Sequence, residues 1–150
     1  MRVEVTVQYA LPRRGLPHAA TVRRWAWAAL AGRCRGGQLT VRFVSRAEGA
    51  RLNKVWRGKR GATNILAFPG GRVSPRATWL GDMAICVPVV RAEAMAQGKS
   101  VNTHCAHMVV HGALHLLGYD HRRRAEALVM ERCETAILNE LGYPDPYSTE

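Results

Sequence analysis

The sequence has few cysteines and no long apolar run, and these two absences exclude several classes of protein. Its four cysteines are scattered without a C-x-x-C pair, which argues against a zinc ribbon or a disulfide scaffold. No apolar stretch reaches the length of a membrane span, and the first residues alternate instead of forming a signal peptide. Low-complexity tracts and repeats of fixed period are also missing. We therefore expect a cytoplasmic protein without a membrane partner, in which Cys34, Cys86, Cys105 and Cys133 pack as small apolar groups.

Acidic residues are scarce beside basic ones. Lys and Arg total 22 against 11 for Asp and Glu, which gives a formal net charge of +11. Nearly all of this positive charge is arginine, whose guanidinium binds phosphate through two parallel hydrogen bonds and stacks on bases. A polyanionic partner is therefore plausible, with RNA or DNA as the first candidate. The alternative interpretation is a solvated basic surface without a nucleic-acid partner.

The length of 150 residues and an apolar content of 47% predict one folded domain over residues 1–150. Periodicity and turn residues predict an α+β fold, a small mixed β-sheet covered by helices, with a loosely held tail at 144–150. The expected strands are 3–7, 38–44 after a turn at Gly36-Gly37, 63–68 ended by Pro69-Gly70-Gly71, and 79–87. The expected helices are 17–32, 45–56, 88–98, 100–117 and 122–141.

The strongest chemical signal is a histidine cluster near the end of the helix predicted at 100–117. His111 and His115 are spaced i and i+4, so both rings leave one face of that helix about one turn apart. Gly118 can adopt the left-handed conformation that ends a helix, and the chain can then return His121 to the same place. Three neutral imidazoles suit one zinc ion at about 2.1 Å, with a fourth position open to water.

Other histidines compete for the same role. His107 and His111 are also spaced i and i+4, but about 12 Å of helix rise separates His107 from His115, so these two cannot share an ion. The turn at Gly118 favours the pair His111 and His115, because only this pair lies beside a third ligand on the returning chain. We expect His107 and His104 to form hydrogen bonds behind the site or to line the cleft.

Two neighbours of the cluster bear on the chemistry. Asp120 either orients a ligand histidine or stabilises the turn, and the sequence favours neither interpretation. A zincin protease carries its general base directly after the first histidine, in H-E-x-x-H, whereas this chain has Gly112 there. The protease mechanism therefore does not fit.

A basic segment, residues 53–61, carries four cations around Trp56 and two glycines. Glycine lets a backbone approach a phosphate closely, and Trp56 can stack on a base. Alternatively, Trp56 packs in the core and the cations are only solvated. Thr63 and Asn64, just before an apolar strand, either contribute polar groups at a cleft edge or simply begin the strand.

These residues fall into motifs that resemble the bacterial YbeY family of zinc-dependent endoribonucleases, also called rRNA maturation factors. The match runs through nearly the whole chain in the expected order. The matching segments are Leu52-Asn53 with Trp56-Arg57-Gly58-Lys59, Thr63-Asn64-Ile65-Leu66 with Phe68-Pro69, Leu80-Gly81-Asp82-Met83-Ala84-Ile85, His111-Gly112 with Leu114-His115-Leu116-Leu117-Gly118-Tyr119-Asp120-His121, Met130-Glu131 with Glu134, and Tyr143 with Asp145-Pro146-Tyr147.

The resemblance implies both a site and a function. It places His111, His115 and His121 at the zinc-ligand positions, and Arg57 at the position of a functionally required arginine. It further implies cleavage of single-stranded RNA, a role in 16S rRNA 3′-end maturation and ribosome quality control, association with the small ribosomal subunit, and a zinc helix beside a basic cleft.

The chain also departs from the family pattern. Trp56 stands where a tyrosine is common, Ala67 where a serine is frequent, and a run of three arginines (122–124) where relatives often carry acidic residues. The arginine run can strengthen RNA contact near the metal or alter which RNA is cut.

We therefore expect metal-assisted phosphodiester cleavage with one zinc ion, in which Arg57 stabilises charge in the transition state. The flanking phosphates are expected to contact Lys59, Arg60, Arg122 and Arg123. No general base is evident, and a 2′,3′-cyclic phosphate product would indicate attack by the ribose 2′-OH. Two alternatives remain, a ribosome assembly factor with a structural zinc and a zinc peptidase.

Overall fold

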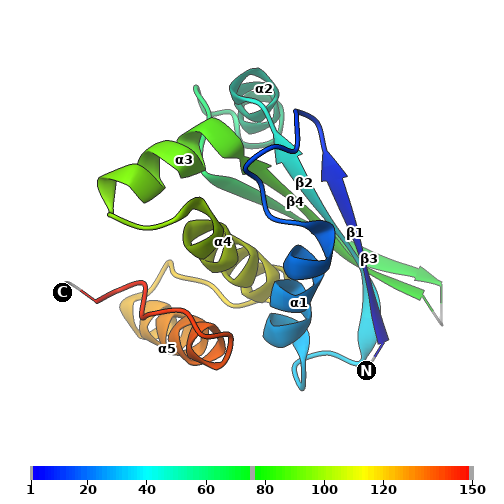
Figure 1. The fold of residues 1–150 in the computed structure, drawn as a ribbon. Helices are drawn as coiled ribbons and strands as arrows, with labels where there is room; N and C mark the ends of the chain where they lie inside the picture. The colour runs from blue at the N-terminus through cyan, green and yellow to red at the C-terminus, as the bar shows by residue number, and fades with distance from the viewer. Residues whose placement is uncertain (1, 75–76, 149–150) are drawn as a thin grey trace.

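A four-stranded mixed sheet forms the centre of the computed structural model, which describes residues 2–74 and 77–148 (Figure 1). The strand order is β1-β2-β4-β3; β1, β2 and β4 run parallel, and β3 pairs antiparallel with β4 at one edge. This arrangement confirms the predicted α+β class and the small mixed sheet. The strands are β1 (Arg2–Tyr9), β2 (Gly36–Val44), β3 (Ile65–Ser74) and β4 (Ala77–Cys86).

Five helices pack around this sheet. In Figure 1, α1 and α4 lie against one face, and α5 lies outside α4. Their bounds are α1 (Ala19–Leu30), α2 (Arg46–Arg57), α3 (Val87–Ala96), α4 (Val101–Leu116) and α5 (Arg124–Glu140).

The main core fills the space between one face of the sheet and these helices. Side chains alternate between the two faces along a strand, so Leu39, Val41 and Phe43 of β2 and Met83 and Ile85 of β4 point to this face. The largest side chains buried there include Trp25, Leu30, Leu39, Val41, Phe43, Met83, Ile85 and Leu114. This core holds α4 rigidly against the sheet, and α4 carries most of the histidines.

The opposite face of the sheet is covered only in part. A smaller cluster of Val44, Leu66, Ala84 and Cys86 packs there, with Leu52 of α2 against it. Helix α2 begins at Ser45, whose hydroxyl accepts a hydrogen bond from the Glu48 N–H at 3.2 Å, as the capping-box spacing predicts. The remainder of this face stays open, and α2 forms one wall above it.

One predicted boundary is wrong by several residues, at a proline, and the turn predicted at two glycines is part of a strand instead. Strand β3 continues through Pro69, although the sequence predicts that it ends there. Because β3 pairs only with β4, a proline on this edge strand can direct its missing N–H away from the ladder. Gly36, expected in a turn, lies in β2, where an added Cβ would come within 2.6 Å of the Arg2 carbonyl oxygen. The glycine therefore permits close pairing with β1.

The cysteines pack as the sequence predicts. All four cysteines are described and unpaired; Cys86 and Cys105 are buried, and Cys34 and Cys133 are half-buried. Burial raises the pKa of the Cys105 thiol to about 12, as an apolar packing role requires. Within the part of the chain that the structure describes, no helix has both the length and the apolar character needed to cross a membrane.

Candidate metal centre and catalytic cleft

The turn after α4 brings the three predicted histidines together. Gly118 has φ of 102°, and the Tyr119 N–H donates to the Leu114 carbonyl, so the helix ends there as the sequence predicts. The chain then returns and places the His121 ring 5.6 Å from the His111 ring and 6.5 Å from the His115 ring, measured between centroids. Burial and the neighbouring His111 lower the pKa of His115, which keeps this ring neutral near pH 7.

These histidines line a cleft of about 400 Å³. The cleft lies between the end of α4, the beginning of β3 and the end of α2. Its polar side chains include the predicted Arg57 and Arg122 as well as the three histidines. The other predicted RNA contacts, Lys59, Arg60 and Arg123, are exposed and fall outside the set of described residues that line the cleft.

The end of α2 determines the position of Arg57. Gly58 adopts a left-handed φ of 65° and stops the helix directly after Arg57. Asn53, which is buried, then anchors the following loop through its amide, which donates to the Gly61 carbonyl at 2.8 Å. The Asn53 carbonyl also accepts the Lys59 N–H at 3.3 Å. The basic loop is therefore fixed to the helix, and Arg57 faces the cleft from a rigid support.

Asn64 and Asp120 are both held by local hydrogen bonds at the cleft. The Asn64 amide N–H donates to Glu93 at 3.2 Å, and its side-chain oxygen accepts the Ile65 N–H at 2.7 Å, so Asn64 directly precedes β3 and lines the cleft. Asp120 Oδ1 accepts the His121 N–H at 2.7 Å, a hydrogen bond that lowers the pKa of Asp120. The structure therefore supports the turn-stabilising interpretation of Asp120.

Glu134 of α5 forms a buried network behind the histidines. Its carboxylate is 1% exposed and can only accept, so His107 Nε2 donates to it at 2.5 Å and His111 Nδ1 at 3.2 Å. The Tyr147 hydroxyl donates to both carboxylate oxygens at 3.0 and 2.9 Å. Burial alone would raise the pKa of Glu134, but the hydrogen bonds from His107 and His111 outweigh it and lower the pKa to about 2.

This network corrects one prediction and confirms another. Tyr147 is fixed by Glu134, so the tail is held at this residue rather than loose; the last two tail residues, 149–150, lie outside the described chain. His107 and His104 form the hydrogen bonds that were expected of them, His107 with Glu134 and His104 with Glu93 at 2.9 Å.

A second group of donors lies beside the predicted one. The ligand atoms of His107, His111 and Glu134 lie within 4.8 Å of one another, so this group can hold a metal ion. Sequence reasoning noted Glu134 only within a motif and missed its contacts. A signal was present, because Glu134 occupies a buried position of α5 together with Met130 and Ile137, where an unpaired carboxylate would be costly.

Known proteins resemble this chain over its full length. A family model described as Endoribonuclease YbeY matches residues 19–142. Two curated proteins named Endoribonuclease YbeY, from Stenotrophomonas maltophilia and Xanthomonas campestris pv. campestris, are each 50% identical over 155 residues, covering 100% of this chain and 96% of the relative. The chain belongs to the endoribonuclease YbeY family. This membership confirms the resemblance drawn from the motifs and the predicted enzyme class, a nuclease among the hydrolases.

A solved structure supports the fold of this YbeY family member independently. The solution structure of a Thermotoga maritima protein matches with a TM-score of 0.60, covering 96% of this chain and 99% of its own. The two sequences are only 19% identical, so the likeness concerns the fold alone.

Proposed function

We propose that this chain is a zinc-dependent endoribonuclease that cuts single-stranded RNA. The main support for this proposal is that three histidine rings and Arg57 line one open cleft. We further propose a role in 16S rRNA 3′-end maturation and ribosome quality control, with the small ribosomal subunit as partner and the cytoplasm as location. Family membership and the net charge of +11 support an RNA partner.

We assign the zinc ion to His111, His115 and His121. Glu134 accepts a hydrogen bond from the Nδ1–H of His111. In the neutral ring the Nε2 atom therefore carries the free lone pair that a metal ligand needs. Two imidazoles that bind one tetrahedral zinc ion at about 2.1 Å have ring centroids about 5 Å apart. The His121 centroid lies 5.6 Å from that of His111 and 6.5 Å from that of His115, so the exposed His121 ring must move closer to both when the ion binds. Three imidazoles are a donor set that suits zinc.

The competing group, His107, His111 and Glu134, fits a metal less well. The imidazole nitrogens of this group already donate hydrogen bonds to the Glu134 carboxylate, and the Tyr147 hydroxyl donates to the same carboxylate. Neither His107 nor Glu134 belongs to the described residues that line the cleft. A metal held there would have little access to substrate, whereas Glu134 as a hydrogen-bond partner orients a ligand.

The residues around the assigned site have distinct tasks. When bound, zinc supplies a Lewis acid that polarises a phosphoryl oxygen or lowers the pKa of water. Arg57 supplies a positive charge in the same cleft, where it can stabilise the extra negative charge of the transition state. Arg122 offers a second cation at the rim for a neighbouring phosphate. A cleft of about 400 Å³ accommodates a phosphodiester and its riboses.

Gly112 counts against the peptidase alternative. An added Cβ at this position would lie 2.5 Å from Met83 Sδ and 2.7 Å from Ile65 Cδ1, both in the packed contact between α4 and the sheet. The glutamate that a zincin protease uses as general base cannot be accommodated there without disrupting this contact. The open cleft also argues against a purely structural zinc, because structural sites are closed by four protein ligands.

Replacing Arg57 with alanine is expected to slow RNA cleavage by about 10²-fold while zinc content stays at that of the wild-type protein. The reason is the loss of one preorganised charge beside the reacting phosphate. The measurement is the single-turnover cleavage rate of a single-stranded RNA by zinc-loaded protein. Arg57→Lys should recover part of the rate, and Arg33→Ala, an exposed arginine far along the chain from the cleft, is the matched control. Wild-type cleavage by Arg57→Ala would show that Arg57 takes no part in the reaction.

A further inference from the structure

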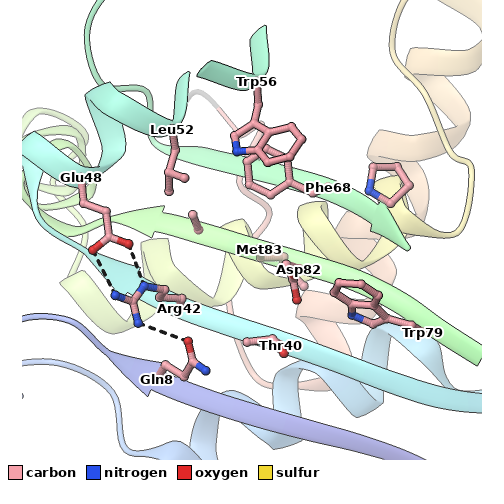
Figure 2. Close-up of a pocket in the computed structure, with 12 residues that line it drawn as sticks. Gln8, Thr40, Arg42, Glu48, Leu52, Trp56, Phe68, Trp79, Asp82 and Met83 are labelled. Atoms are coloured by element: carbon pink, nitrogen blue, oxygen red, sulfur yellow. Dashed lines mark hydrogen bonds and ion pairs between the residues drawn. The ribbon is translucent and has the colours of Figure 1, made fainter. Parts of the chain in front are cut away.

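A groove of about 470 Å³ lies on the open face of the sheet (Figure 2). Helix α2 forms one wall with Glu48, Leu52 and Trp56, which are spaced four residues apart and therefore share one side of the helix. The sheet supplies the floor and the far end, through Phe68, Trp79 and Asp82 among others. The proposed cleavage site uses none of these side chains.

Two tryptophans of this groove are left open to solvent. Trp56 is 67% exposed and Trp79 is 42% exposed, so Trp56 does not pack in the core. The Trp56 ring rests against Phe68 with centroids 5.8 Å apart and planes at 55°, which supports the indole on one side only. Figure 2 shows Trp56 above Phe68 and Trp79 further along the groove. Exposed aromatic rings of this kind are platforms on which unpaired bases stack.

The charges of the groove favour a base over a phosphate. Arg42 is neutralised by Glu48, with Arg42 Nε donating to the carboxylate at 2.7 Å. Asp82 stands on the floor and adds a negative charge that repels phosphate. A carboxylate accepts hydrogen bonds from base N–H groups, and guanine presents two of them side by side, N1–H and the exocyclic amino group, whereas uracil presents N3–H alone. Phosphates instead match the exposed cations Lys54 and Arg57 in the last turn of α2.

The groove borders the proposed cleavage site. Trp56 and Arg57 are consecutive, and Trp56 lines the groove while Arg57 lines the cleft. Strand β3 is shared in the same way, since Ala67 faces the cleft and Phe68 faces the groove. An RNA strand that leaves the cleft over the edge strand therefore reaches the tryptophans within a short distance along its backbone.

We propose that this groove is a base-binding subsite for an unpaired nucleotide of the RNA strand whose phosphodiester lies in the cleft. Trp56 stacks on the base, and Asp82 accepts a hydrogen bond from its amino group. The subsite rests on the proposed function, because it takes the substrate of that reaction. It accounts for a preference for single-stranded RNA, since both faces of a base inside a duplex are covered by the neighbouring bases.

Replacing Trp56 with alanine is expected to weaken RNA binding by about 5- to 150-fold, the range for loss of one base stack. The measurement is fluorescence anisotropy of zinc-loaded full-length protein with a cleavage-resistant RNA of about twelve nucleotides carrying 2′-O-methyl riboses and phosphorothioate linkages. Trp56→Tyr should bind within about threefold of wild type, because tyrosine keeps a stacking face. Val55→Ala is the matched control, since Val55 is 68% exposed on the same helical turn and does not line the groove.

Cleavage kinetics separate this role from a structural one. For unmodified RNA, Trp56→Ala should raise KM and leave kcat at saturating RNA close to wild type, whereas a folding defect would lower the active fraction and therefore kcat. The wild-type protein should also favour guanine over uracil at one position near the cut, and Asp82→Asn should reduce that preference. Absence of any such positional preference would overturn the role of Asp82.

The outcomes distinguish the subsite from the proposed function. If wild-type protein binds RNA but cuts none, while Trp56→Ala still weakens binding, the subsite stands and the nuclease proposal fails. If wild-type protein cuts RNA and Trp56→Ala changes neither binding nor KM, the subsite is wrong. In that second case the groove is better explained as a surface for a protein partner.

Discussion

Replacing His115 with alanine is expected to lower zinc affinity by roughly 10³-fold or more and to abolish RNA cleavage at limiting zinc. Apparent zinc affinities of about 10–16 kcal/mol are shared among few ligands, so one of three imidazoles contributes several kcal/mol. His115 lines the cleft and has no part in the Glu134 network, so its loss should affect the metal without disturbing that network. Zinc content by mass spectrometry and affinity by chelator competition measure the effect.

His107→Gln is the informative comparison. His111 belongs to both possible donor groups, whereas His115 belongs only to the group that lines the cleft and His107 only to the group with Glu134. We expect His107→Gln to retain stoichiometric zinc and to lose less than about tenfold in affinity, as His107 contacts only the carboxylate behind the site. The reverse pattern, in which His115→Ala keeps zinc and His107→Gln loses it, would place the metal on His107, His111 and Glu134.

Replacing Glu134 with alanine is expected to destabilise the fold by about 3–5 kcal/mol. The change leaves the N–H groups of two half-buried imidazoles and the Tyr147 hydroxyl without their acceptor, and it opens a space in the contact between α4 and α5. The free energy of unfolding by urea, measured on metal-free protein, tests this expectation. Glu140→Ala, an exposed glutamate on the same helix, should stay within about 0.5 kcal/mol of wild type.

Glu134→Gln extends the test to the metal, and it keeps the fold available if the alanine variant does not fold. The amide has one acceptor oxygen in place of two, so His111 loses part of the hydrogen bonding that fixes its ring. We expect zinc affinity to fall by about 10–100-fold. Unchanged zinc affinity in Glu134→Gln would show that the carboxylate stabilises the fold without orienting the ligand.

Local patterns in the sequence are sufficient to predict most of the fold. The alternation of Leu39, Val41 and Phe43 predicts a strand with one buried face, and the structure buries all three. Gly118 predicts the end of a helix, and its positive φ confirms the prediction. The grouping of His111, His115 and His121 follows from the same local information, because helix periodicity and one turn determine it.

The features that the sequence misses depend on contacts between distant segments. Glu134 meets His111 across 23 positions of the chain, and no periodicity on α5 indicates which helix it will face. The sequence fits a buried and an exposed Trp56 equally well, because the exposure of this side chain depends on which other segments of the chain pack beside α2. The length of β3 likewise depends on its edge position, since the same Pro69 would interrupt a central strand.

The most direct test of the central claim, that zinc on three histidines drives RNA cleavage, is an assay of metal-free wild-type protein. Zinc is removed from the protein with a chelator, and the absence of zinc is verified. The metal-free protein is then mixed with single-stranded RNA, before and after addition of one equivalent of zinc. We predict that cleavage is lost without metal and returns with a single equivalent, as one site of three histidines requires. Cleavage at the full rate by the verified metal-free protein would contradict the account.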